Sequence, residues 1–371
     1  MTTRRGLLAA AGIAFCGCCL RGPARAQGAA PSPGQGTAPA RRPVTVAGKR
    51  VKTVDTHAHC IFADALALLG TNAQAAVPAT KGVEEHFLAV PGAVEARLRA
   101  MDDMGVDMEI LSINPFWYAA DRDLAARIVG LNNDHLAELC AAHPDRFGAF
   151  ASLTMQFPDL AVKQLEDAVR KGGLKGAAIG GSVLGDSFSE PKYRPILAKA
   201  EELGAVLFIH PQSVPELARR FAGNGWLANT IGNPLDTTIA LQHLIYEGTL
   251  DRFPGLKVLA AHGGGYLGSY APRSDHACFV SPQNCNPGVA LKKAPTEYLN
   301  QLYFDSLVFT PEALRHLVAQ VGAGQVVLGT DFPIPWELHP ADHVLATTTL
   351  SDDDKLAILG GNAARLFGLT S

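Results

Sequence analysis

The sequence has little charge and little cysteine for its length. Only 18% of its 371 residues are charged, the formal net charge is −3, and 7 residues are cysteine. A near-neutral balance gives no electrostatic basis for binding nucleic acid, and sparse cysteine excludes a small scaffold held together by disulfides. A hydrophobic content of 47% excludes an intrinsically disordered chain. We therefore expect a globular protein with a large core and a small-molecule partner.

The sequence also lacks an apolar segment long enough to cross a membrane easily. Its N-terminal apolar run, residues 7–20, is too short to cross a bilayer easily, follows Arg4 and Arg5, and precedes the small residues Ala24 and Ala26. We interpret residues 1–26 as a signal peptide of the twin-arginine type, with an ordinary secretory signal as the alternative. Residues 27–45 are predicted to be a flexible leader and residues 46–371 the folded domain. The mature protein would then be exported, periplasmic or secreted, with no membrane span.

Removal of such a signal leaves four cysteines, Cys60, Cys140, Cys278 and Cys285. Cys278 and Cys285 lie close together, and an oxidising compartment permits a disulfide between them. Two free thiols are the alternative, and we favour it from the sequence alone.

Strand-like and helix-like segments alternate along the rest of the chain. Eight short runs predict strands: 51–59, 108–114, 147–155, 176–181, 205–211, 257–264, 302–308 and 326–333. The clearest helical patterns are 93–104, 123–143, 159–171, 192–203, 236–251, 311–321 and 352–367. This alternation predicts an α/β fold, a (β/α)8 TIM barrel. A doubly wound open sheet is the competitor, but the first strand is followed by no glycine-rich dinucleotide-binding motif.

Polar side chains gather where the predicted strands end. The first strand ends in His57 and His59, two residues apart and therefore on one side of the strand. His210, His262 and Asp331 end the fifth, sixth and eighth strands. Each residue alone could be a core histidine or a helix cap, but all five fall at the carboxyl end of the barrel, where such folds place their chemistry. Three histidines and an aspartate form a plausible site for a divalent metal such as Zn²⁺ or Mn²⁺.

The motifs around these residues resemble those of the amidohydrolase superfamily, and more narrowly the branch of aminocarboxymuconate-semialdehyde decarboxylase and related aromatic acid decarboxylases. The matching segments are Val54–His59, 131–134, 143–147, 209–211, 233–238, 261–265, 329–333 and 361–367. The resemblance runs from about residue 51 to the end of the chain.

The resemblance implies a metal-dependent hydrolase-type barrel with one catalytic metal, usually Zn²⁺. His57, His59, His210 and Asp331 would be the ligands and His262 the acid/base, with Asp331 an alternative proton donor. Relatives with two metals carry a bridging residue at the end of the fourth strand, where this chain has Gly180-Gly181-Ser182. We therefore predict one metal rather than two.

Two activities remain open on this scaffold. The first is a carboxy-lyase, a non-oxidative decarboxylase of an aromatic or unsaturated carboxylic acid, and the alternative is a hydrolase such as a lactonase, amidase or esterase. Residues 82–88 lack the carboxylate-binding arginine of the aminocarboxymuconate enzymes, and Asn229 stands where they have a tryptophan. Both departures argue against that particular substrate.

Arg273 matches an arginine that the family donates across a homodimer interface to bind a substrate carboxylate. The alternative for this residue is a surface salt bridge. Phe116, Trp117 and Tyr118 either line an aromatic pocket or pack as an ordinary loop. We assign the remaining histidines, including His86 and His343, to a solvated background.

Overall fold

A computed structural model of the protein describes residues 41–70, 86–88, 92–285 and 288–369. The predicted signal peptide, residues 1–26, and residues 27–40 of the predicted leader lie outside this range. Among the described residues, none of the helices combines the length and apolarity that crossing a membrane requires.

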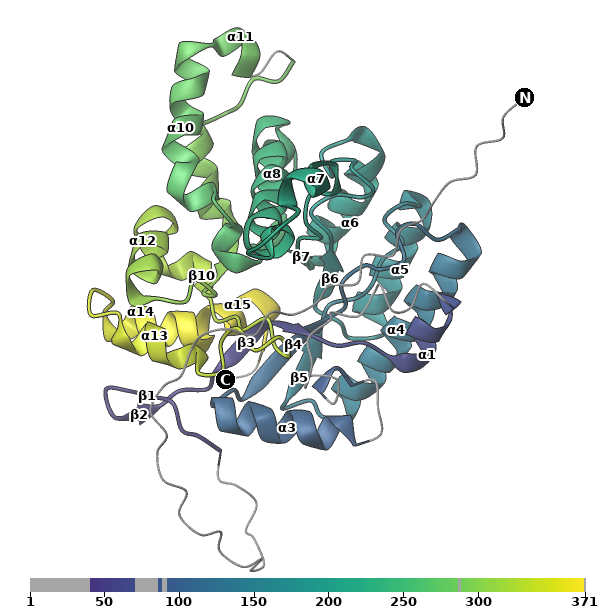
Figure 1. The fold of residues 1–371 in the computed structure, drawn as a ribbon, viewed down its shortest axis with the longest axis vertical. Helices are drawn as coiled ribbons and strands as arrows, with labels where there is room; N and C mark the ends of the chain where they lie inside the picture. The colour runs from purple at the N-terminus through teal and green to yellow at the C-terminus, as the bar shows by residue number, and fades with distance from the viewer. Residues whose placement is uncertain (1–40, 71–85, 89–91, 286–287, 370–371) are drawn as a thin grey trace, which may run out of the picture. The chain divides into compact units, whose positions relative to one another are not determined.

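Eight parallel strands form the centre of the fold (Figure 1). They are β3 (Val54–His59), β4 (Met108–Ser112), β5 (Phe147–Ala149), β6 (Gly176–Ile179), β7 (Val206–Ile209), β8 (Lys257–Ala260), β9 (Leu302–Asp305) and β10 (Val326–Val327). Each lies within one of the eight segments predicted from the sequence. The strands are buried on both faces, which explains their nearly continuous apolar character.

The strands pair as a sheet of three, β3-β4-β5, and a sheet of five, β10-β9-β8-β7-β6. Backbone contacts join the two sheets at both edges. Single parallel bridges link Ala151 to Ala177 and Ala58 to Phe332. The backbone N–H of Thr56 also donates to the carbonyl of Leu328 at 2.9 Å. These contacts complete a ring of eight strands, so the predicted (β/α)8 barrel is confirmed.

Helices follow the strands around the outside of the barrel (Figure 1). The longer ones are α3 (Ala93–Met104), α4 (Arg122–Ala142), α5 (Pro158–Arg170), α6 (Arg194–Leu203), α8 (Asn233–Tyr246), α10 (Leu267–Val280) and α12 (Pro311–Val321). The shorter ones are α1 (Ala63–Ala67), α7 (Ala218–Phe221), α9 (Thr249–Arg252), α11 (Pro282–Cys285), α13 (Pro340–Ala346), α14 (Asp352–Leu356) and α15 (Asn362–Phe367). The sequence did not predict α10, because Pro272 and a run of polar residues interrupt its apolar pattern.

A network of ion pairs occupies the amino end of the barrel, beside the hairpin of β1 (Thr45–Val46) and β2 (Lys49–Arg50). The carboxylate of Asp107, which immediately precedes β4, accepts from Arg41 at 2.8 Å, Arg50 at 2.5 Å and the backbone N–H of Thr53 at 2.9 Å. Arg146 donates to Asp102 at 2.8 Å and to the carbonyl of Asp107 at 2.9 Å. Each acceptor here faces donors, so the network is satisfied within the chain.

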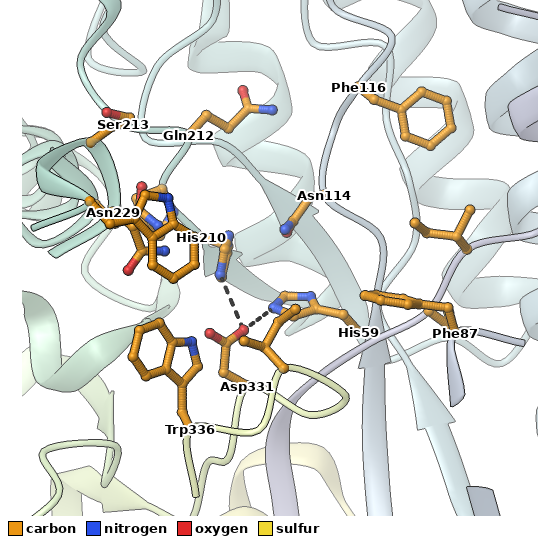
Figure 2. A pocket seen from close by; sticks show the side chains of 17 residues that line it. His59, Phe87, Asn114, Phe116, His210, Gln212, Ser213, Asn229, Asp331 and Trp336 are labelled. Atoms are coloured by element: carbon orange, nitrogen blue, oxygen red, sulfur yellow. Dashed lines mark ion pairs between the residues drawn. The ribbon is translucent and has the colours of Figure 1, made fainter. Parts of the chain in front are cut away.

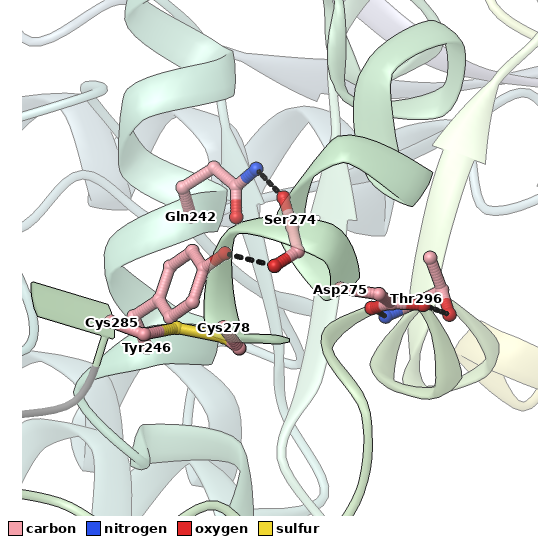
Figure 3. Close-up of a disulfide and its surroundings, with 7 residues drawn as sticks. All are labelled: Gln242, Tyr246, Ser274, Asp275, Cys278, Cys285 and Thr296. Atoms are coloured by element: carbon pink, nitrogen blue, oxygen red, sulfur yellow. Dashed lines mark hydrogen bonds between the residues drawn. A yellow bond between two sulfur atoms is a disulfide. The ribbon is translucent and has the colours of Figure 1, made fainter. Parts of the chain in front are cut away.

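A disulfide joins Cys278 on α10 to Cys285 on α11 (Figure 3). The sequence-based preference for two free thiols is therefore wrong. The reason is a reversal of the chain after Val280, which brings the two Cα atoms to 4.9 Å, within the range that a disulfide spans. The adjacent turn of α10 is held to α8, since Tyr246 donates to the carbonyl of Ser274 at 3.1 Å.

Candidate metal centre

Four histidines and one aspartate meet at the carboxyl end of the barrel. One carboxylate oxygen of Asp331 lies 3.2 Å from Nε2 of His57, 2.7 Å from Nε2 of His59 and 3.8 Å from Nε2 of His210. Its other oxygen lies 3.7 Å from Nε2 of His262. The five residues come from the ends of four different strands. The sequence-based expectation that the barrel brings them together is confirmed.

His57 is oriented by a buried carboxylate that sequence reasoning missed. Nδ1 of His57 lies 2.6 Å from an oxygen of Asp305, the last residue of β9. Asp305 also accepts from the backbone N–H groups of His262 at 2.8 Å and Gly263 at 2.9 Å. Since it follows a buried strand just as Asp331 does, its position at a strand end was a signal that could have found it.

The opposite ring nitrogens of His57 and His59 face one another beside the carboxylate of Asp331. Nδ1 of His59 lies 2.8 Å from the hydroxyl of Ser112, and Nε2 of His57 lies 3.1 Å from Nε2 of His59. When Nδ1 of His57 donates to Asp305, its Nε2 is a lone pair directed at another lone pair and at a carboxylate. Imidazole nitrogens and a carboxylate oxygen in this arrangement are suited to hold a divalent cation.

His210 supports the same interpretation. Neither of its ring nitrogens has a hydrogen-bond partner among the described residues, although both are buried. Buried polar atoms are normally satisfied, so an orphaned imidazole aimed at a carboxylate fits a ligand position. Within the described chain, side-chain atoms of His57, His210, His262 and Asp331 lie within 4.8 Å of one another. Distance alone therefore does not separate His59 from His262 as a ligand.

The charges of the cluster centre on Asp331. Burial opposes a charged imidazolium, but the carboxylates of Asp331 and Asp305 raise the pKa of His57 to about 10. Burial would raise the pKa of Asp331, yet His57 and the neighbouring imidazoles hold that pKa well below its ordinary value. Burial, together with His59, lowers the pKa of His210 well below its ordinary value. The cluster therefore favours an ionised Asp331 beside a charged His57 and a neutral His210.

Two of the five residues adopt a strained backbone. His262 has φ of 56° and Asp331 has φ of 63°, in the left-handed region that non-glycine residues rarely occupy. Strain of this kind persists where the surrounding structure enforces it, and it is concentrated at functional sites. Gly265 completes the turn after His262, because a Cβ there would lie 2.1 Å from the carbonyl oxygen of Pro234.

A cavity of about 350 Å³ opens onto the cluster, as Figure 2 shows. His59, His210 and Asp331 form its floor, and carboxamides and aromatic rings form its walls. The lining is His59, Cys60, Ile61, Phe87, Asn114, Phe116, His210, Pro211, Gln212, Ser213, Trp226, Ala228, Asn229, Asn233, Asp331, Ile334 and Trp336. A smaller cavity is lined in part by His262 and shares Asn229, Asn233 and Trp336 with the first.

Aromatic side chains border this cavity in a way that the sequence did not reveal. Trp226 and Trp336 stack with ring centroids 5.6 Å apart and planes 14° apart. Of the predicted aromatic loop, Phe116 lines the cavity, whereas Trp117 is buried and donates to the carbonyl of Leu153 at 2.8 Å. Asn229, which stands where the aminocarboxymuconate enzymes have a tryptophan, lines the cavity. Trp226, three positions earlier, lines it too.

Two other predicted residues lie elsewhere. Arg273 is exposed on α10 and is not among the residues that line the cavity. His343, assigned to the solvated background, is buried, and its Nε2 lies 2.8 Å from the carbonyl oxygen of Ser306. That expectation is wrong because α13 packs against the barrel through this residue.

Comparison with known proteins places the chain in a family. Residues 54–369 match the amidohydrolase family model. The chain belongs to the amidohydrolase family. It is 34% identical to the 2-amino-3-carboxymuconate-6-semialdehyde decarboxylase of Dictyostelium discoideum over 74% of this chain and 76% of that protein. It is 33% identical to the gamma-resorcylate decarboxylase of Rhizobium radiobacter, over 74% and 87% of the two chains.

One similar solved structure contains a bound metal ion. The dihydroxybenzoic acid decarboxylase of Polaromonas sp. JS666, with bound manganese and the inhibitor 2-nitroresorcinol, is similar with a TM-score of 0.73 and 28% identity. The match covers 86% of this chain and 97% of that one. The protein therefore belongs among the metal-dependent, non-oxidative decarboxylases of this family. Its cluster of histidines and Asp331 is a site for a divalent metal. Each of these three relatives is a decarboxylase, and none supports the hydrolase alternative.

Proposed function

We propose that this protein decarboxylates an aromatic carboxylic acid that carries ring hydroxyl groups, of the dihydroxybenzoate kind. The observation that carries the proposal is the convergence of four imidazoles on Asp331 at the floor of a cavity walled by aromatic rings and carboxamides. The floor suits the carboxylate end of the substrate. The carboxamides of Asn114, Gln212 and Asn229 suit the ring hydroxyls, because an amide both donates and accepts.

We assign His57, His59, His210 and Asp331 as the metal ligands and His262 as the acid/base. His262 fits that role because its side chain is the most exposed of the five, at 16%, and reaches the smaller cavity. Zn²⁺ follows from the sequence resemblance and Mn²⁺ from the Polaromonas structure; both accept imidazole and carboxylate ligands. A bound divalent ion would hold the substrate oxygens and stabilise the negative charge that develops during decarboxylation.

The reaction needs one proton transfer. A proton is added to the ring carbon that bears the carboxylate. The bond between the ring carbon and the carboxylate carbon then breaks. Its electron pair restores the aromatic ring as CO₂ leaves. Either His262 delivers the proton directly, or it first passes the proton to the second oxygen of Asp331, which lies 3.7 Å from Nε2 of His262 and then delivers it. The stacked pair of Trp226 and Trp336 would limit access of water during this step.

The test is CO₂ release from 2,6-dihydroxybenzoate by the metal-loaded protein, measured beside a panel of esters, lactones and amides. We expect CO₂ release that 2-nitroresorcinol inhibits, and no hydrolysis. Hydrolysis of a lactone or ester, lost in His262→Ala, with no CO₂ from any aromatic acid would overturn the proposal.

We further propose a homodimer in which Arg273 of one subunit binds the substrate carboxylate in the other. Arg273 lies on α10, whose surface also exposes Tyr270 at 66% and Phe279 at 84%. Exposed aromatic side chains of this size are typical of interfaces. Light scattering should give twice the chain mass, and Arg273→Ala should raise KM without loss of metal. A monomer with unchanged KM would contradict this proposal.

Finally, we propose that the protein is exported through a twin-arginine signal. The disulfide between Cys278 and Cys285 supports this proposal, because such bonds persist in oxidising compartments. The full-length chain should appear in the periplasmic fraction, and replacement of Arg4 and Arg5 by lysine should retain it in the cytoplasm. Unchanged export of the lysine variant would favour the ordinary secretory signal.

A further inference from the structure

We infer that Arg97 is a positioning residue, which holds a metal ligand and one wall of the substrate cavity in register. Arg97 lies on α3, and its side chain is fully buried. Its Nε donates to Glu109 on β4 at 2.6 Å. Its Nη1 donates to two backbone carbonyls, those of His59 at 2.6 Å and His86 at 2.7 Å.

These contacts all involve segments that form the site. His59 contributes Nε2 to the cluster around Asp331, and Phe87, next to His86, lines the cavity. The guanidinium also lies over the ring of Phe332, 5.0 Å from its centroid, and Phe332 follows Asp331 in the chain. The guanidinium of Arg97 therefore contacts the backbone of His59, a proposed ligand. It also contacts Phe332, the neighbour of Asp331, and the backbone of His86, the neighbour of the cavity residue Phe87.

Stability alone does not account for this arrangement. Burying an ion pair costs desolvation that roughly offsets its attraction, and apolar side chains of similar volume often replace such pairs without loss. A guanidinium, in contrast, presents several donors in a fixed plane, which lysine cannot reproduce. The geometry thus points to a role in fixing the relative positions of β3, β4 and the segment at 86–88.

The test compares Arg97→Lys with Arg146→Lys. Arg146 is a matched control because it also donates to a carboxylate and a backbone carbonyl, but at the amino end of the barrel. Equilibrium dialysis measures Mn²⁺ binding, and steady-state kinetics at saturating Mn²⁺ measure KM and kcat for 2,6-dihydroxybenzoate. We expect Arg97→Lys to weaken Mn²⁺ binding about 10- to 100-fold. It should also raise KM more than it lowers kcat, whereas Arg146→Lys should change neither Mn²⁺ binding nor KM.

Equal Mn²⁺ binding and equal KM in the two variants would overturn the inference, whatever their melting temperatures. Should Arg97→Lys fail to fold, Glu109→Gln gives the answer instead, since it keeps the side-chain volume and removes the charge that orients Arg97. It should weaken Mn²⁺ binding in the same direction, and unchanged binding would overturn the inference. The kinetic readout rests on the proposed function, but Mn²⁺ binding does not. Failure of the unmodified protein to release CO₂ is therefore distinguishable from failure of this inference.

Discussion

The two ends of the barrel both gather ionisable side chains, but they arrange them in opposite ways. At the amino end, Asp107 is surrounded by the donors of Arg41, Arg50 and Thr53, so every strong acceptor has a partner. At the carboxyl end, Asp331 faces the ring nitrogens of His57 and His59, which already use their other nitrogens elsewhere. A network of paired arginines and carboxylates is what a structural role requires, whereas imidazoles that converge on a single buried carboxylate are typical of a metal site.

The largest effect that separates the two ends should come from Asp331→Ala. Loss of this carboxylate removes the group on which the imidazoles converge, so we expect loss of the bound metal and of at least about 1,000-fold in kcat. Elemental analysis and CO₂ release measure the two effects. Full metal content in this variant would show that the cluster is held by the histidines alone.

The next largest effect should come from His262→Ala. General acid/base catalysis contributes about 100- to 10,000-fold, so turnover should fall by that factor while the metal is retained. Metal content and kcat are measured on the same sample. If the metal is lost instead, His262 is a ligand and the division between ligands and acid/base is wrong.

A smaller effect should come from Asp305→Asn. An amide at this position lacks the negative charge of the carboxylate, so it holds the proton on Nδ1 of His57 less strongly and leaves Nε2 a weaker ligand. Replacing a group that orients a ligating histidine costs about 10- to 100-fold in metal affinity. Dialysis against Mn²⁺ measures the loss, and unchanged affinity would mean that Asp305 does not set the state of His57.

The smallest effect on the metal site should come from Asp107→Asn, a change in the ion-pair network at the amino end of the barrel. Burial opposes ionisation of Asp107, but Arg50, Thr53 and Arg41 lower its pKa. A lowered folded-state pKa stabilises the fold at pH values above the ordinary value of 3.8, and this stabilisation is lost as the pH falls through the folded-state pKa. The variant should therefore melt lower at pH 7, lose less stability on acidification, and bind Mn²⁺ normally. Thermal melts between pH 7 and pH 3 provide the check; weakened Mn²⁺ binding would contradict the separation of the two ends.

Much of the fold was predictable, because its signals are local. All eight barrel strands lie within predicted segments, since each is a short apolar run bounded by turns. The ends of α3 and α12 match the predicted helices for the same reason. The helix α10 was missed because Pro272 lies inside it and its partly exposed surface has no clear apolar stripe.

The candidate site was predictable where residues occupy strand ends and unpredictable where contacts are long-range. His57, His59, His210, His262 and Asp331 all lie at the carboxyl ends of predicted strands, so the predicted barrel places them together. Arg97 contacts the His59 carbonyl across 38 positions of sequence, and an arginine on a helix gives no local sign of being buried. The stacking of Trp226 on Trp336 likewise joins two loops that only the closed barrel brings together.

The central claim is that the carboxyl-end cluster is a site for a single metal ion. Elemental analysis of the purified protein, beside Asp331→Ala and Asp107→Asn, tests it most directly. We predict about one divalent ion per chain in the unmodified protein and in Asp107→Asn, and none in Asp331→Ala. Two ions per chain, or equal metal content in all three proteins, would contradict it.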